Sequence, residues 1–243
     1  MHVSGEGRVV GHVAGLWRYP VKSMGGEALD RAEVSWHGVA GDRRWAFVRH
    51  RVATSGFPWL TLRERHDMNG YRPAFVDSDR PDRSAVRVTT PSGAIRDMTD
   101  PALAAELYPD GATAIRQDRG TFDTFPLSLI STQTIASLGR SVGMTLDVRR
   151  FRPNLLVCAV DGSAFPEDEW VGRVLRIGDF RMRIDKRDGR CVVITIDPTT
   201  AERTPAILRS VASERGGCLG VYGTTVTPGP VAPGDMVLIE SRS

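Results

Sequence analysis

The segment Val174-Leu-Arg-Ile-Gly-Asp-Phe-Arg-Met-Arg-Ile184 decides the fold. In its second half, apolar residues alternate with arginines, which is the period-2 pattern of a strand with one buried face. The pair Gly178-Asp179 separates this strand from the apolar segment before it, and a two-residue link of this kind is typical of a β-hairpin. The segment therefore predicts two antiparallel strands that bury apolar side chains on one face and expose arginines on the other.

Further short segments of the same kind surround this hairpin. They are rich in β-branched or alternating apolar residues, and glycine or proline turns separate them. The predicted strands span residues 8–16, 28–35, 45–49, 85–89, 155–160, 174–177, 180–184, 191–196 and 236–240. Many short strands joined by such turns are typical of β-barrels and sandwiches. We therefore expect a mostly β protein with a few helices.

Three segments carry helix signals instead. Each begins at a Ser, Thr or Asp that can cap a helix, and the last two end at glycine. The predicted helices run from the cap Asp100 through residue 107, from Ser131 or Thr132 to Gly143, and from the cap Thr204 to Gly216-Gly217. The 243 residues allow two small domains, and the polar stretch 117–124 is where we expect them to join. This divides the chain into residues 1–120 and 121–243.

Composition excludes several classes of protein. The 32 basic residues nearly balance the 29 acidic ones, so the net charge of +3 gives no reason to expect a nucleic-acid partner. Three cysteines are too few for a disulfide scaffold, which favours a reducing compartment. The longest apolar run covers residues 155–160, far short of the roughly 20 residues of a membrane-spanning helix. We expect a cytoplasmic protein with no membrane partner. All basic residues are arginines except Lys22 and Lys186.

Cys191 is the cysteine with a chemically suggestive environment. It follows Arg190 and a Gly189 turn, at the end of a segment in which basic residues outnumber acidic ones. Positive charge stabilises a thiolate, the form that attacks electrophiles and binds metals. Cys158 lies in an apolar strand, and we interpret it as a buried structural residue. Spacing alone favours the other interpretation, an ordinary cysteine at a strand edge.

Several familiar catalytic patterns are missing from the sequence. It has no Cys-x-x-Cys, no Gly-x-Ser-x-Gly and no Gly-x-Gly-x-x-Gly, and its five histidines lack zinc-type spacing. Groups suited to anions are present instead, at Lys22-Ser23 on a Pro-bent turn and at Ser131-Thr132 where a helix starts. A further donor-rich cluster surrounds Arg152 and Asn154. One soft thiolate with several phosphate-type contacts predicts a bulky anionic cofactor whose metal or electrophilic centre takes one sulfur ligand.

The chain resembles MOSC-domain proteins over nearly its whole length. The N-terminal half carries Leu16-Trp-Arg-Tyr-Pro-Val-Lys-Ser23 and Gly38-Val-Ala-Gly-Asp-Arg43, as in the N-terminal β-barrel of that family. The C-terminal half carries Phe151-Arg-Pro-Asn154, Arg190-Cys191 and Gly220-Val-Tyr222, as in the MOSC domain itself. The pattern is most similar to the amidoxime-reducing components and their bacterial counterparts. The resemblance implies an N-terminal MOSC-type β-barrel domain followed by a MOSC β-barrel.

The resemblance also implies a cofactor and a function. In the family, the cysteine of the Arg-Cys pair ligates the molybdenum of a molybdopterin cofactor, and this role falls on Cys191 as metal ligand and catalytic residue. The expected cofactor-binding residues are Lys22, Ser23, Arg43, Arg44, Ser131, Thr132, Arg152, Asn154, Arg190 and Tyr222. The implied activity is a molybdenum-dependent oxidoreductase that reduces N-hydroxylated compounds such as amidoximes, hydroxylamines and N-hydroxylated bases.

Two departures from the family pattern bear on function. After Cys191 the chain reads Val-Val-Ile-Thr-Ile-Asp-Pro-Thr-Thr200-Ala201 where the family often has paired threonines and Asp-Pro-x-Thr-Gly, which leaves the substrate open. No ferredoxin-type cysteine cluster follows, so electrons are expected from a separate protein. The alternative function is a molybdenum-cofactor or sulfur carrier that uses a Cys191 persulfide. Desulfurase activity within the chain is not expected, because only Lys22 and Lys186 could serve as a Schiff-base lysine.

Overall fold

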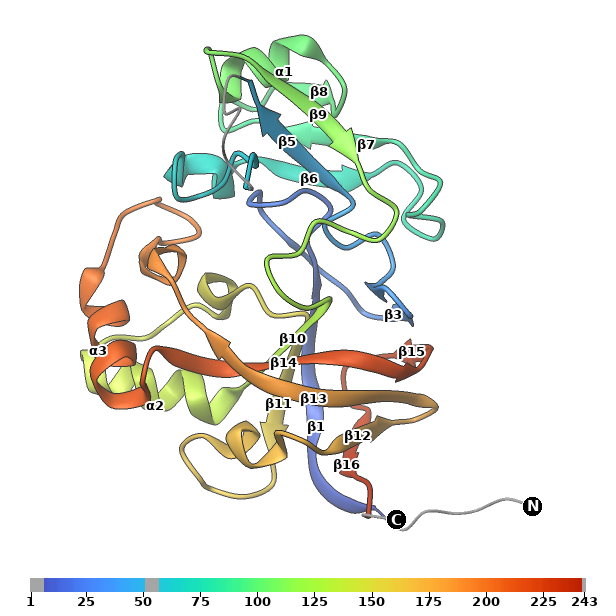
Figure 1. Ribbon diagram of the computed structural model, residues 1–243, viewed down its shortest axis with the longest axis vertical. Coiled ribbons are helices and arrows are strands. Elements are labelled where there is room, and N and C mark those ends of the chain that lie inside the picture. The colour runs from blue at the N-terminus through green and yellow to red at the C-terminus, as the bar shows by residue number, and fades with distance from the viewer. Residues whose placement is uncertain (1–6, 51–56, 242–243) are drawn as a thin grey trace.

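The computed structural model describes residues 7–50 and 57–241, and within them it consists of short strands with three α-helices. The small sheets around β5 and β6 lie at one end of the molecule, and the strands of the C-terminal half lie at the other, with α2 and α3 beside them (Figure 1). The expected mostly β fold with a few helices is therefore confirmed.

A closed barrel forms the larger part of the molecule. Its strand order is β11-β10-β14-β13-β12-β16-β1, and the pairing of β1 with β11 closes the ring. The barrel strands are β1 (Arg8–Arg18), β10 (Leu127–Ser131), β11 (Leu155–Ala159), β12 (Val174–Ile177), β13 (Phe180–Gly189), β14 (Cys218–Thr227) and β16 (Met236–Ile239). Because β1 comes from the start of the chain, N-terminal residues complete a barrel made mostly of C-terminal strands.

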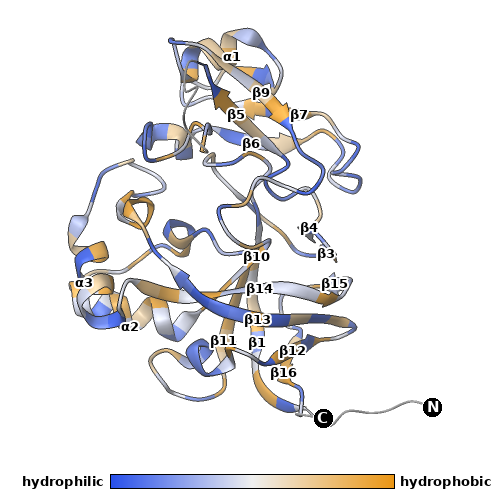
Figure 2. Ribbon diagram, viewed as in Figure 1, coloured by the Kyte–Doolittle hydropathy of each residue, from blue (hydrophilic) through white to orange (hydrophobic). Residues whose placement is uncertain are grey.

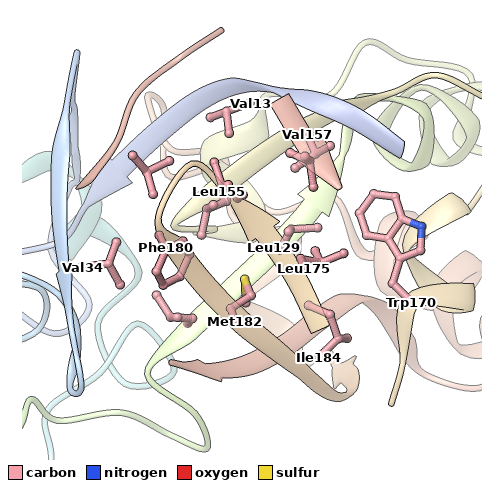
Figure 3. Packing of buried hydrophobic residues seen from close by; sticks show 14 of the residues in the cluster. Val13, Val34, Leu129, Leu155, Val157, Trp170, Leu175, Phe180, Met182 and Ile184 are labelled. Atoms are coloured by element: carbon pink, nitrogen blue, oxygen red, sulfur yellow. The ribbon is translucent and has the colours of Figure 1, made fainter. Parts of the chain in front are cut away.

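The hairpin expected from the sequence is β12–β13. Ile177 pairs with Phe180, and Gly178 between them has a φ of 58°, which glycine adopts without strain. Phe180, Met182 and Ile184 are fully buried and point into the barrel core, where side chains from the other strands meet them (Figure 3). Their neighbours along the strand are polar, so most of β13 is hydrophilic in Figure 2, whereas β10 and β11 are mainly hydrophobic.

Smaller sheets with a core of their own form the other end of the molecule. The apolar cluster there includes Phe47, Leu62, Met98 and Leu103. The sheets are β5 (Trp45–Arg49) with β9 (Ala112–Arg116), and β6 (Arg72–Phe75) with β7 (Val86–Thr89) and β8 (Ile95–Asp97). Shorter strands are β2 (Glu27–Ala28), β3 (Ala32–Ser35), β4 (Gly38–Val39) and β15 (Gly229–Val231). Since β1 belongs to the barrel and β3 pairs with β15, the division of the sequence near residue 120 stays a prediction.

All three predicted helices form. They are α1 (Pro101–Leu107), α2 (Thr132–Val142) and α3 (Pro205–Arg215). The side chain of Asp100 caps α1 by accepting a hydrogen bond from the Ala102 amide, and Ser131 caps α2 in the same way through Thr134. Thr204 precedes α3 but makes no side-chain cap bond. α2 and α3 share an apolar cluster with β10 and β14 that covers one side of the barrel.

Two strand predictions were wrong in detail. Residues 191–196 do not continue β13 but form the short 3₁₀ helix η4 (Val192–Thr195). The reason is that Ile194 and Ile196 enter two different apolar clusters, which a single strand face would not allow. The expected strand 28–35 is interrupted between β2 and β3. The other 3₁₀ helices are η1 (His66–Gly70), η2 (Val148–Phe151) and η3 (Pro166–Trp170).

None of the helices in the described part of the chain is both long and apolar enough to cross a membrane.

Candidate functional site

A cavity of about 440 Å³ lies where the two ends of the molecule meet. Its walls come from the turn after β1, the turn before β5, and residues 61–63 after β5. Opposite them are the end of η2, the end of β13, part of β14 and the start of η4. The segment between β9 and β10, which passes from one end of the molecule to the other (Figure 1), supplies residues 122–125. Residues from both ends of the molecule and from the segment between them therefore line this cavity.

Cys191 lines the cavity at the position that precedes η4. Its side chain is partly exposed, and Nη2 of Arg63 lies 3.5 Å from its sulfur. Burial lowers the pKa of Arg63, but its interactions with Cys191 and Asp123 outweigh this effect, so the pKa is raised overall. Arg63 belongs to the other end of the molecule, which means that the cation beside this sulfur is brought to it by the tertiary fold.

Lys22 lies in the same cavity and is almost fully buried. Its ammonium group donates to the Thr121 carbonyl oxygen at 3.1 Å and forms an ion pair with the carboxylate of Asp123. Burial lowers the pKa of Lys22, and Asp123 opposes that shift. Burial raises the pKa of Asp123, but Lys22 and Arg63 outweigh it, so this pKa is lowered overall. The connecting segment thus holds Lys22 through a backbone carbonyl oxygen and a carboxylate.

Arg43 and Arg152 place two like charges close together. The carbon atoms of their guanidinium groups lie 4.7 and 4.3 Å from the centroid of the Tyr19 ring. Arg43 pairs with Asp42, whereas Arg152 donates to the Met24 carbonyl oxygen and a side-chain amide oxygen, both neutral. Burial, together with Arg43, lowers the pKa of Arg152 to about 10. Nη2 of Arg152 is buried without a hydrogen-bond partner in the described structure, as is Nη2 of Arg190, so both guanidinium groups keep a donor that an acceptor could use.

Backbone strain is concentrated at this cavity. In the described residues, four non-glycine residues have a positive φ, and three of them line the cavity: Ser23 at 69°, Arg43 at 50° and Arg152 at 50°. Such conformations cost about 1–3 kcal/mol each and persist where the surrounding fold enforces them. Their gathering at one place points to a site where the positions of the side chains matter more than local stability.

Arg190 serves a different purpose from the one its sequence position suggests. Its guanidinium donates to the carbonyl oxygens of Leu219 at 2.7 Å and Phe151 at 2.9 Å, and its Nη1 lies 3.0 Å from the Asp188 carboxylate. The side chain is only 6% exposed. Arg190 therefore ties η2, β13 and β14 together and fixes the turn that carries Cys191.

Asp188 and Tyr222 meet on the cavity wall. The Asp188 carboxylate accepts a hydrogen bond from the Ser128 hydroxyl at 3.4 Å, and Tyr222 lines the same cavity. Burial raises the pKa of Asp188, and Arg190 counteracts part of the rise. The pKa of Tyr222 is also raised, by burial and by the neighbouring Asp188. Burial and the Arg190 cation therefore act on the Asp188 carboxylate in opposite directions.

The structure brings together most of the residues that the sequence singled out. Those that line the cavity are Lys22, Ser23, Arg43, Arg152, Asn154, Arg190, Cys191 and Tyr222. Asn154 uses its amide to bind the Ser128 amide and the Trp17 carbonyl oxygen, so it holds β10 and β1 in place.

Three predicted residues lie outside the cavity. Arg44 is buried against Asp82, with 3.0 Å between Nε and Oδ1. Ser131 is committed to capping α2, and Thr132 donates to Gln133 in the same helix. Helix caps and anion sites use the same residue types, so the sequence alone did not separate the two roles.

Arg63, Asp123 and Asp188 are among the cavity residues that were not predicted as site residues. Asp123 lies in the stretch interpreted as a linker. Asp188 was only counted as one of the few acidic residues before Cys191. Arg63 carried no sequence signal, because 128 residues separate it from Cys191.

This donor set fits an anionic metal cofactor. No group of three His, Cys, Asp or Glu side chains in residues 7–50 and 57–241 is placed to hold a metal ion by itself. A metal at Cys191 would therefore take its other ligands from a non-protein group. An incomplete cationic site around Arg152 lies in the same cavity as this thiol, which suits a cofactor with a phosphate at one end and a metal at the other.

Comparison with known families covers both halves of the chain. The MOSC N-terminal beta barrel domain matches residues 10–115, and the MOSC domain matches residues 116–238.

Individual relatives are distant. Mitochondrial amidoxime reducing component 2 of Bos taurus is 26% identical over 234 residues, which covers 79% of this chain and 68% of the relative. Molybdenum cofactor sulfurase of Danio rerio is 40% identical over 77 residues, or 31% of this chain and 9% of that protein. Among solved structures, the YUAD protein from Bacillus subtilis shares the fold, with a TM-score of 0.50 and 12% identity over 97% of this chain and 98% of that one.

Proposed function

Because this chain belongs to the MOSC family, we propose that it is a molybdenum-cofactor-dependent oxidoreductase that reduces N-hydroxylated compounds. The observation that carries this proposal is the cavity, where the Cys191 thiol and an incomplete cationic site share one space of about 440 Å³. Neither feature alone would distinguish a cofactor site from a reactive cysteine or a structural arginine pair.

Different residues of the cavity would bind different parts of a molybdopterin cofactor. Cys191 would supply the protein's sulfur ligand to molybdenum, with Arg63 stabilising its negative charge from 3.5 Å. Lys22, Ser23, Arg43 and Arg152 would hold the terminal phosphate, because they provide buried donors and the unpartnered Nη2 of Arg152. When bound, the cofactor supplies two-electron redox chemistry, and the protein supplies position and electrostatics.

The substrate proposal rests on relatives and on the remaining lining of the cavity. The amidoxime reducing components share most of this chain's length, and their name states the substrate class. Leu62, Phe122 and Phe125 are among the apolar residues of the cavity wall, and such surface suits the organic part of an amidoxime or hydroxylamine. We propose that a separate redox protein delivers the electrons.

Substitution of the sulfur tests the proposal. Cys191→Ser should lose molybdenum and the ability to reduce benzamidoxime with reduced benzyl viologen as electron donor. Metal analysis and the fluorescence of the oxidised pterin are measured on the same sample, so that loss of metal is separated from loss of the whole cofactor. Cys158→Ser and Cys218→Ser are matched controls, since neither residue lines the cavity. A full molybdenum content in Cys191→Ser would remove Cys191 from its role.

The second candidate is a carrier of the cofactor or of sulfur through a Cys191 persulfide. The Arg63–Cys191 contact favours it as well, because a guanidinium stabilises a persulfide anion as it does a thiolate. The two functions differ in whether the molybdenum-loaded protein catalyses the reduction of N-hydroxylated compounds. Molybdenum-loaded protein that reduces none of a panel of amidoximes, hydroxylamines and N-hydroxylated bases would favour the carrier.

A further inference from the structure

Asp123 places a carboxylate of the chain itself among the cations of the cavity. One of its oxygen atoms pairs with the ammonium group of Lys22, and the other lies 3.4 Å from Nη2 of Arg63. Lys22 is only 6% exposed, and within the described structure its ammonium group donates to this carboxylate and to the carbonyl oxygen of Thr121. The contact therefore joins a buried cation to the connecting segment between β9 and β10.

The cations of the cavity wall are balanced unequally. Three of its arginines have a carboxylate partner of their own: Arg43, Arg150 and Arg190. Lys22 and Arg63 share Asp123, and Arg152 forms no ion pair within residues 7–50 and 57–241. Arg152 donates to the carbonyl oxygen of Met24, two residues after Lys22, so both cations lie at the turn after β1. A phosphate monoester carries a charge of about −1.5 to −2 at pH 7 and would balance these cations better than one carboxylate does.

The part of the connecting segment that carries Asp123 has few other attachments. Upstream, the Thr121 amide donates to the carbonyl oxygen of Arg43 at 2.8 Å, and downstream β10 begins at Leu127. Residues 122–126 between these points form no backbone hydrogen bond within the described structure. The side chain of Asp123 is 43% exposed. Its carboxylate can therefore leave Lys22 for water without breaking a backbone hydrogen bond.

We propose that Asp123 is an internal substitute for phosphate, which pairs with Lys22 until a phosphate group displaces it. This inference rests on the function proposed above, because the phosphate in question is the terminal one of the cofactor. One ion pair of Lys22 is exchanged for another, and no covalent bond changes. The affinity of the site for phosphate is then the difference between two ion pairs, so Asp123 lowers it. Phosphate binding also releases the connecting segment from the cationic wall.

Calorimetric titration of the full-length, cofactor-free protein with inorganic phosphate tests the competition. Asp123→Asn keeps the shape of the side chain but removes its charge, so it should bind phosphate about tenfold more tightly than the wild type. The gain is expected even though Lys22 loses an ion pair and the variant becomes less stable. Asp118→Asn is the matched control, because Asp118 belongs to the same segment, is 88% exposed and does not line the cavity. It should keep the wild-type affinity.

Magnetic resonance of the lysine side chains separates displacement from a general gain in positive charge. The chain has only two lysines, Lys22 and Lys186, so protein labelled with ¹³C and ¹⁵N in lysine gives two side-chain signals, and Lys186→Arg assigns them. Without phosphate, the Lys22 signal should differ between the wild type and Asp123→Asn. With saturating phosphate, the two Lys22 signals should coincide, because phosphate is then the partner of Lys22 in both proteins.

The outcomes separate this inference from the function on which it rests. An unchanged phosphate affinity in Asp123→Asn would overturn the inference, and so would Lys22 signals that stay as different with phosphate as without it. If Asp123→Asn does not fold, Asp123→Ser takes its place, and a wild-type Lys22 signal that saturating phosphate does not move is enough to refute displacement. None of these measurements needs molybdenum. Cofactor-loaded protein that reduces no N-hydroxylated compound would overturn the proposed reductase activity and leave the displacement of Asp123 intact.

Discussion

The cavity wall contains two buried arginines from the same half of the chain, Arg152 and Arg190, whose charges are balanced differently. Arg190 has a carboxylate at 3.0 Å and two backbone carbonyl oxygens within 2.9 Å. Arg152 lies beside a second guanidinium, and within residues 7–50 and 57–241 no carboxylate forms an ion pair with it. The protein therefore neutralises Arg190 with its own carboxylate, whereas Arg152 has only neutral hydrogen-bond acceptors among the described residues.

This difference separates two uses of the same side chain. An arginine with internal partners holds a shape, and its removal leaves those partners buried and unpaired. An arginine without an anionic partner costs stability in the empty protein, and a ligand that supplies the anion recovers that cost. The following substitutions test whether Arg190 and Arg152 differ in this way and how far the difference extends to neighbouring residues.

The largest change in stability is expected at Arg190, whose charge is balanced by Asp188. Arg190→Met leaves the carboxylate of Asp188 buried without its cation, which typically costs about 3–5 kcal/mol of unfolding free energy. Urea unfolding of metal-free protein measures the loss. The matched control is Arg181→Met, whose partner Glu240 is near the surface, and its loss should stay below about 1 kcal/mol. Equal losses in the two variants would contradict a structural role for Arg190.

At Arg152, the change in unfolding free energy should be zero or of the opposite sign. Arg152→Met removes an uncompensated cation, so the metal-free protein should be as stable as the wild type or more stable. Inorganic phosphate should bind the variant at least about tenfold more weakly, which corresponds to about 1.4 kcal/mol. Calorimetric titration with phosphate gives the affinity, and the urea midpoint gives the stability. A destabilised variant with unchanged phosphate affinity would place Arg152 in the same class as Arg190.

A smaller effect, visible through pH, is expected at Asp123. Its pKa in the folded protein is below the ordinary 3.8, so its contribution to stability is present above that pH and is lost as the pH falls through the folded value. Asp123→Asn should therefore be less stable than the wild type at pH 7 and nearly equal to it well below pH 3.8. Urea unfolding at several pH values tests this, and a constant difference across the range would refute it.

The smallest effect is expected outside the cavity. Thr132→Ala changes a residue that the sequence pattern assigned to the cofactor but that lies on α2, away from the cavity. The stability should change by no more than about 0.5 kcal/mol, and the phosphate affinity should not change. A weaker phosphate affinity in this variant would show that the anion extends beyond the cavity walls described above.

Local patterns were sufficient for much of the fold. The β12–β13 hairpin follows from alternation and a Gly-Asp turn, and α1 and α2 begin at the expected caps, because these signals act between residues close in sequence. The segment 191–196 was mistaken for a strand because β-branched residues favour strands on average. Its two isoleucines belong to different apolar clusters, which only the tertiary fold decides.

The sequence predicted the chemistry of the site better than it predicted which residues line the cavity. Lys22, Arg43 and Cys191 lie within motifs, so their place in the cavity was expected. Arg63 reaches Cys191 from the other end of the molecule. Asp188, on β13, lies close to residues of β10 and β14. The spacing of residues in the sequence does not predict such contacts, because they depend on how separate elements pack.

The position of β1 between β11 and β16 has a consequence for biosynthesis. The barrel needs both its first strand and its last, so it cannot close until nearly the whole chain has left the ribosome. Lys22 and Ser23 directly follow β1, and they reach the cavity only when this long-range pairing is made. Pairing of such distant segments is intrinsically slow. Assembly of the cavity is therefore a late event in folding, and a cofactor that needs both walls would be captured by the finished chain rather than during its synthesis.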